Sequence, residues 1–193
     1  WKDNPDWSVG VEFCLTSEWE YFRWGPLTSR DKVASLVGPD GTFWHRPEQF
    51  LAHAEYHHVE TECREQADRL LDTGLQPSHA LCHMDVLRQR DDLHELFLKL
   101  VEDYRRPARY PQITLKQPWP VNEGLIGADH GSILPVEERQ RLLFEDVRAM
   151  RPGIWEIYGH CSAAGEEIQA NTGRERDRPA WPDSWRLRVH DME

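Results

Sequence analysis

The stretch Ser78-His79-Ala80-Leu81-Cys82-His83-Met84 carries two histidines at the ends of a short apolar run. A run of this length and composition is typical of a buried strand. The apolar residues at positions 93, 96, 97, 100, 101 and 104 then predict an amphipathic helix over residues 93–104. In α/β enzymes the catalytic groups lie at the carboxyl ends of the strands. The stretch therefore predicts an α/β fold with its chemistry close to His83.

A second strand is predicted upstream, where apolar and polar residues alternate over residues 9–16. Glu12 would then point away from the apolar face of that strand. The pattern also predicts a helix over 55–72 and strands near 108–113 and over 154–158. Strands that alternate with helices favour parallel pairing, in a doubly wound sheet or a barrel.

The segment before Pro135 is rich in proline and glycine and predicts a loop. Pro135 then marks the start of another helix. Its buried face is expected to carry Val136, Leu143, Val147 and Met150, which recur at helical spacing.

Composition limits the classes of protein to which the chain can belong. Its 193 residues suit a single domain over residues 1–193, and a net charge of -11 argues against nucleic-acid binding. We find no apolar segment long enough to span a membrane and no signal-peptide pattern, which predicts a cytoplasmic protein. The four cysteines show no paired spacing and suggest reduced thiols. Because the sequence opens on Trp1 rather than methionine, a missing N-terminal element is expected.

Two histidines four residues apart can offer two imidazoles to one metal ion, because on a strand or on a helix both project to one side. His79 and His83 satisfy that spacing. A pair of this kind is also common as ordinary hydrogen-bonded histidines, and both interpretations stay open. The rule for strand ends separately predicts that Thr16, His83 and His160 are neighbours.

Three segments resemble the motifs of the YdjC-like carbohydrate deacetylases. The family pattern Gly-Val-His-Leu-x-Leu-Thr matches Gly10-Val11-Glu12-Phe13-Cys14-Leu15-Thr16, with Glu12 in the position of the family's histidine. The pattern Thr-His-Leu-Asp-Ser-His matches Ser78-His79-Ala80-Leu81-Cys82-His83, and a late His-Pro pair matches His160-Cys161. The resemblance spans most of residues 6–191. The family's Asp-Asp strand, which supplies a metal ligand and the catalytic base, would precede Trp1.

The resemblance implies an irregular, TIM-barrel-like (β/α) barrel of mostly parallel strands, here incomplete. It also implies metal-assisted hydrolysis of the N-acetyl group of an amino-sugar oligosaccharide. His83 would bind a divalent ion, magnesium or zinc, and Glu12 would be a carboxylate ligand. His160 would be the acid that assists the leaving amine, and His79 would lie on the substrate side.

The nine tryptophans suit stacking on sugar rings as well as core packing. Trp19, Trp24 and Trp44 are the candidate substrate-binding residues. The expected partner is a small amino-sugar or oligosaccharide, and a homodimer is one assembly left open.

Several alternatives remain at this point. Because Glu12 replaces a histidine and the Asp-Asp strand is absent, the chain is also consistent with an inactive relative that binds sugar. Glu12 is also consistent with an ordinary carboxylate on a solvated strand face. Cys14, Cys82 and Cys161 lie within two residues of site positions, which permits a thiolate-rich metal site or a nucleophilic thiol. An α/β interaction domain without catalysis would require His83 and His160 to lie far apart.

Overall fold

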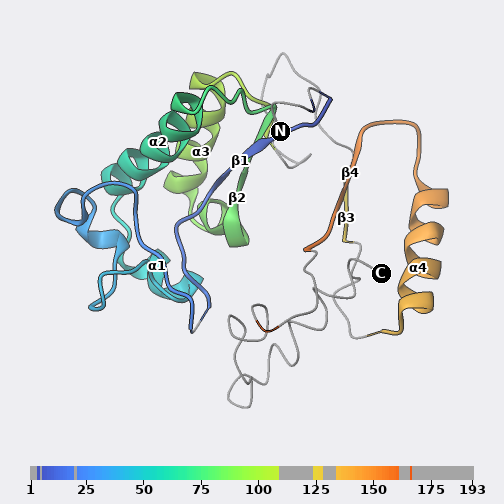
Figure 1. Ribbon diagram of the computed structural model, residues 1–193, viewed down its shortest axis with the longest axis horizontal. Helices are drawn as coiled ribbons and strands as arrows, with labels where there is room; N and C mark the ends of the chain where they lie inside the picture. The colour runs from blue at the N-terminus through green and yellow to red at the C-terminus, as the bar shows by residue number, and fades with distance from the viewer. Residues whose placement is uncertain are drawn as a thin grey trace. The chain divides into compact units, whose positions relative to one another are not determined.

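The structure, a computed structural model, divides the chain into two compact units (Figure 1), Trp1–Arg109 and Tyr110–Glu193. It describes residues 4, 6–19, 21–108, 124–127, 134–160 and 166. Each unit is described by itself below. The prediction of a single domain over residues 1–193 stays a prediction.

Two parallel strands form the centre of the first unit. Strand β1 spans Gly10–Phe13, strand β2 spans His79–Cys82, and the pairing runs from Gly10 opposite His79 to Phe13 opposite Cys82. Val11 and Phe13 are buried, whereas Glu12 between them is exposed, as the alternating pattern predicts. An isolated parallel bridge from Ala80 to Ala108 continues the pairing. The rest of the strand predicted near 108–113 lies outside the described residues.

Helices α2 (Tyr56–Asp72) and α3 (Asp91–Asp103) pack beside the strand pair (Figure 1). Both confirm helices predicted from the apolar repeat. The Phe97 ring meets the Phe13 ring edge-on, with centroids 6.2 Å apart, and both side chains are buried. Burial of apolar surface between α3 and the strands therefore stabilises the first unit.

Shorter helices connect these elements and were not predicted. They are the 3₁₀ helices η1 (Arg30–Lys32), η2 (Ala34–Leu36) and η3 (His83–Arg88), and the α-helix α1 (Pro47–His53). Pro47 occupies the first turn of α1, where its missing N–H leaves no hydrogen bond unmade. Phe50 of α1 and Leu36 of η2 are fully buried, so these short helices are fastened to the same core.

Gly74 ends helix α2 in a left-handed conformation, with φ of +82°. A Cβ atom at this position would meet nothing within 4 Å, so a substitution causes no steric clash. Its cost comes from holding a side-chain-bearing residue in the left-handed backbone conformation. We therefore expect Gly74→Ala to lower the free energy of unfolding by about 1 kcal/mol, with a smaller loss for Gly74→Asn. Urea unfolding of the three proteins measures the difference. An alanine variant as stable as the parent would contradict the expectation.

The second unit contains a parallel pair of its own, β3 (Gly124–Gly127) and β4 (Trp155–Tyr158), and helix α4 (Val136–Ala149). Strand β4 and helix α4 confirm predictions. Strand β3 corrects one, because it lies in the segment expected to be a loop. The expected buried face of α4 is also wrong in part, since Val147 is exposed and Leu143 is only half-buried. The Val136 side chain lies outside the described ones, and among the α4 side chains that the structure describes, Arg139 is buried.

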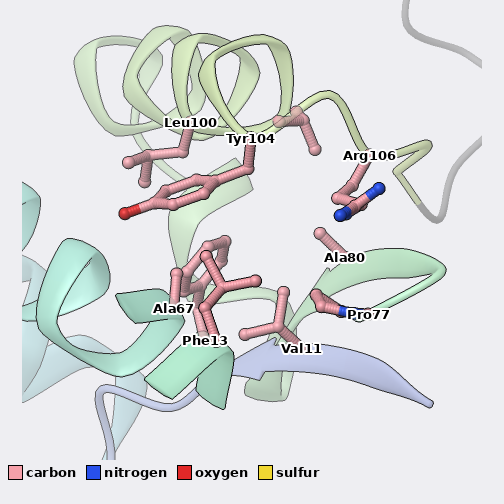
Figure 2. A pocket seen from close by; sticks show the side chains of 10 residues that line it. Val11, Phe13, Ala67, Pro77, Ala80, Leu100, Tyr104 and Arg106 are labelled. Carbon is pink, nitrogen blue, oxygen red and sulfur yellow. The ribbon is translucent and has the colours of Figure 1, made fainter. Parts of the chain in front are cut away.

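A small apolar pocket lies between the strand pair and the two long helices (Figure 2). Leu100 and Tyr104 extend from α3 toward Val11 and Phe13 of β1. Arg106 is the one ionisable side chain in the lining besides the Tyr104 phenol. With no histidine or carboxylate in its walls, the pocket is a gap in the packing and offers no hydrolytic chemistry.

The chain is thus a mixed α/β protein with short parallel strands. The strands described here form two separate pairs and no closed sheet, so the predicted barrel stays a prediction. Among the helices in the described part of the chain, none is long and apolar enough to cross a membrane.

Candidate functional site

His83 follows the last residue of β2 and begins the short helix η3. The next two residues, Met84 and Asp85, have φ of 51° and 57°, in the left-handed region that side chains other than glycine seldom adopt. Arg88 donates to the Asp85 carboxylate at 3.0 Å, and Thr16 Oγ1 donates to Met84 Sδ at 3.4 Å. Strained backbone of this kind concentrates at functional sites. The turn brings Thr16 beside the segment that holds His83, as predicted.

The imidazole of His83 lies between two carboxylates. Nε2 is 3.0 Å from Glu18 Oε2, and Nδ1 is 3.6 Å from Glu12 Oε1. The side chains of His83 and Glu18 are 23% and 17% exposed, whereas that of Glu12 is 49% exposed. Glu18 is therefore a sheltered partner, and Glu12 faces solvent on the other side of the ring.

Three effects act on the pKa of His83. Burial lowers it, but the carboxylates of Glu12 and Glu18 outweigh burial and raise the pKa to about 9. In the absence of a metal ion, the imidazole is therefore protonated at neutral pH, and both ring nitrogens are donors.

The raised pKa predicts a pH-dependent stability for the metal-free protein. A histidine whose pKa rises on folding stabilises the fold fully below its unfolded pKa near 6.5 and loses that contribution as the pH rises through about 9. We expect the free energy of unfolding in a chelator to fall by up to roughly 3 kcal/mol between about pH 6 and about pH 9.5. Glu18→Gln should flatten this decline. Equal pH profiles for the parent and the variant, measured by urea unfolding, would contradict the assignment.

Gln66 of α2 fixes the chain where it leaves β1. Its side-chain oxygen accepts the Cys14 N–H at 2.9 Å, and its side-chain nitrogen donates to the Cys14 carbonyl at 2.7 Å. The same nitrogen donates to the buried carboxylate of Glu62 at 2.8 Å. Glu62 also accepts the backbone N–H groups of Leu27 and Thr28, at 2.9 and 3.0 Å. This Glu62–Gln66 network holds both ends of the segment that carries Glu18.

Arg23 fastens the middle of that segment. Its guanidinium donates to the carbonyls of Ser17 and, at 2.7 Å, of Phe43, and to Thr42 Oγ1 at 2.9 Å. The Ser17 hydroxyl accepts the Trp24 N–H at 3.0 Å. The loop that presents Glu18 to His83 is thus built around satisfied polar groups, which keeps the carboxylate in place.

Trp24 lies against the site. Its ring meets the His83 ring with centroids 6.5 Å apart at 63°, and its Nε1–H donates to Cys14 Sγ at 3.3 Å. The exposed ring of Phe22 lies next to Trp24, with centroids 6.0 Å apart. Trp24, one of the three predicted substrate-binding tryptophans, thus lies against the His83 ring. Its role in binding sugar stays a prediction.

Trp44 and Trp19 are placed differently. Trp44 donates its Nε1–H to the Ser35 carbonyl at 2.9 Å, and its ring stacks on His53 with centroids 4.1 Å apart. Both groups therefore contribute to the fold around α1. Trp19 is half-buried in the loop directly after Glu18. Contact of either side chain with substrate stays a prediction.

Of the two interpretations left open for His79 and His83, the structure argues against the one in which both imidazoles bind one ion. Because β2 is an extended strand, the two Cα atoms are separated by roughly 13 Å. His79 pairs opposite Gly10, where its ring fills the space of a missing Cβ, and its Nδ1 lies 2.9 Å from Ser78 Oγ. His79 is therefore at the opposite end of the strand pair from His83, and a substrate-side role for it stays a prediction.

His160 follows β4 in the second unit, with its ring 6.0 Å from that of Tyr158 in an edge-on arrangement. Its position after a strand matches the prediction. Its proximity to His83 and its role as the acid for the leaving amine stay predictions.

The cysteines near the site do not have the character of nucleophiles. Burial raises the pKa of Cys14 to about 11 and that of Cys82 to about 12. Without a metal ion, both thiols are therefore protonated at neutral pH, whereas nucleophilic attack needs a thiolate. Cys161 lies outside the described residues.

Glu12 and His83 fit two positions around a divalent ion. Neighbouring ligands of a tetrahedral zinc ion are roughly 3.3 Å apart, close to the 3.6 Å between His83 Nδ1 and Glu12 Oε1. Glu18 holds the other ring nitrogen, and a metal-binding histidine commonly gives its second N–H to a carboxylate in this way. Sequence reasoning missed Glu18, although its place just after the strand that carries Glu12 was a signal.

The chain is similar in sequence and in fold to known proteins. The chain is 34% identical over 110 residues to a protein of Brevibacillus brevis named carbohydrate deacetylase, an alignment that covers 57% of this chain and 40% of that protein. The chain also resembles the crystal structure of a protein from Enterococcus faecalis, named as a candidate cellobiose-phosphate cleavage protein. The TM-score is 0.69 at 22% identity, with 91% of this chain and 69% of that chain covered. This second likeness shows a shared fold.

The curated relative is longer than the aligned region, since the match spans about two-fifths of its length. A model of the family described as YdjC-like protein matches residues 1–191, nearly the whole chain. The chain therefore belongs to the YdjC-like protein family.

Proposed function

We propose that the chain forms part of a carbohydrate deacetylase that hydrolyses the N-acetyl group of an amino-sugar oligosaccharide. The observation that carries the proposal is the position of His83 at the end of β2, between Glu18 and Glu12. Its support is the family membership and the similarity to a protein named carbohydrate deacetylase.

In the proposed reaction, Glu12 and His83 would hold a divalent ion, magnesium or zinc. When bound, such an ion polarises the acetyl carbonyl and lowers the pKa of water. Glu18 is the positioning residue, because its carboxylate accepts the His83 Nε2–H and thereby directs Nδ1 toward Glu12. His160 would donate a proton to the amine that leaves.

The substrate would lie with its sugar ring against an aromatic surface. Trp24 contacts the His83 ring, and the exposed Phe22 extends that surface away from the site. Aromatic faces bind the apolar faces of sugar rings while hydroxyl groups remain hydrated. Trp19 and Trp44 remain candidates for the same role.

Release of acetate tests the proposed function. The full chain is incubated with N-acetylated chito-oligosaccharides and with zinc, magnesium or manganese, and free acetate is followed by proton NMR. We expect release that stops when a chelator is added. A well-folded, metal-saturated protein that binds these sugars without releasing acetate would instead identify an inactive, sugar-binding relative.

A further inference from the structure

A second group of metal-ligating side chains lies at the start of helix α2. Glu55, His57 and His58, named here the surface histidine cluster, each offer one ligand atom, and these three atoms lie within 4.8 Å of one another. Glu55 Oε2 is 3.7 Å from His57 Nε2, and the rings of His57 and His58 have centroids 4.1 Å apart. None of these residues belongs to the site around His83.

Ser35 holds two members of the cluster in place. Its hydroxyl lies 2.8 Å from His58 Nδ1 and accepts the backbone N–H of Glu55 at 3.0 Å. The Ser35 carbonyl in turn accepts the Trp44 indole N–H at 2.9 Å. His58 Nδ1 also lies 3.4 Å from the Ser35 backbone nitrogen, so Ser35 fixes the orientation of the His58 ring on two contacts. Partners of this kind orient the ring of a metal-binding histidine.

The backbone beneath the cluster is equally well anchored. The Glu55 carbonyl accepts the N–H groups of His58 and Val59, at 3.0 and 3.1 Å, as the first turn of α2 forms. Val59 is fully buried in the core. The ligand atoms are thus presented by a fixed helix end, while the side chains of Glu55 and His57 are 58% and 69% exposed and open to ions from solvent.

We propose that the surface histidine cluster is a binding site for a transition-metal ion of the zinc, copper or nickel type. Two imidazoles and one carboxylate match the ligand preference of these ions, whereas magnesium and calcium prefer oxygen ligands throughout. Three protein ligands leave coordination positions for water. The proposal is independent of the proposed deacetylase activity. Together with the ion proposed at Glu12 and His83, it predicts two classes of zinc site in the parent protein.

Calorimetric titration with zinc tests the cluster in the His83→Ala background, where the candidate catalytic centre has lost its imidazole. We expect one zinc ion to bind the His83→Ala protein, and binding to weaken at least tenfold on adding His57→Ala or Glu55→Gln. Both added changes affect exposed side chains and should therefore leave the fold intact, and circular dichroism of each variant checks this. Ser35→Ala should weaken binding about 10–100-fold through His58.

Glu48→Gln is the matched control for Glu55→Gln, because this exposed carboxylate lies in the first turn of the neighbouring helix α1 and outside the cluster. It should leave zinc binding unchanged. Magnesium should give no heat of binding at the cluster. A folded His83→Ala protein that binds no zinc, or that binds it equally well after His57→Ala and Glu55→Gln, would overturn the proposal.

Discussion

Replacement of His83 by alanine should lower kcat/KM for acetate release by at least about 100-fold, the largest effect on activity that we expect. Changing a residue that only orients a metal ligand already costs about 10–100-fold, and His83 is proposed as the ligand itself. Glu18→Gln should lower kcat/KM by about 10–100-fold. Gln retains the size of the side chain but loses the charge of the carboxylate that accepts the His83 Nε2–H.

The two variants differ in a second measurement. Glu18→Gln should lower kcat with little change in KM and should retain weakened metal binding, whereas His83→Ala should lose the ion at this site. His94→Ala on α3 is a control outside both proposed metal sites. If metal-saturated His83→Ala kept more than about half of the parent activity, the site would have been assigned to the wrong residues.

Glu62→Ala should lower the free energy of unfolding by about 3–5 kcal/mol, the largest effect on stability that we expect. The carboxylate is fully buried and accepts the N–H groups of Leu27 and Thr28 and one from Gln66. A donor that is shielded from water and loses its acceptor costs about 1–3 kcal/mol, and the truncated side chain also leaves a cavity in the core. Denaturant unfolding of the parent and the variant measures the loss.

Glu62→Gln separates hydrogen bonding from packing. Gln fills the same volume but has one acceptor oxygen, so part of the network is lost and a smaller destabilisation is expected. Because the network holds the loop that carries Glu18, both changes should also lower activity. A Glu62→Ala protein within about 1 kcal/mol of the parent would show that water replaces the carboxylate.

The sequence predicts those elements of the fold whose pattern is set by burial. Helix α3 has its apolar side chains on one face, and all five of its buried residues were in the predicted repeat. Strand β1 alternates between buried and exposed residues, which fixes the direction of Glu12. In both elements one face packs against the same core, so the spacing of apolar residues in the sequence indicates which face is buried.

Elements without such a core could not be predicted in this way. Strand β3 reads Gly-Leu-Ile-Gly, and its glycines favour a loop unless a neighbour such as β4 supplies hydrogen bonds. Helix α4 repeats its apolar residues at helical spacing, yet Phe144 and Val147 are exposed. The spacing of apolar residues indicates a helix, but it does not determine which face of the helix packs against another element.

The candidate site shows the same division. The position of His83 followed from its place at the end of a strand. The contact of Glu18 with His83, and the contacts of Glu62 and Gln66 with the loop, join residues about 35 to 65 positions apart, and the sequence pattern does not show such contacts. The failure of His79 to join His83 follows from the extended shape of β2, because a shared strand face does not bring residues four apart together.

The most direct test follows acetate release as a function of metal occupancy in the His57→Ala/His58→Ala protein, from which the surface histidine cluster has been removed. The remaining ion should then be the one held by Glu12 and His83. We predict that the rate rises in proportion to occupancy, saturates at one ion per chain, and vanishes when His83→Ala is added. Full occupancy without acetate release, or release that is independent of His83, would contradict a hydrolytic centre built on His83, Glu12 and Glu18.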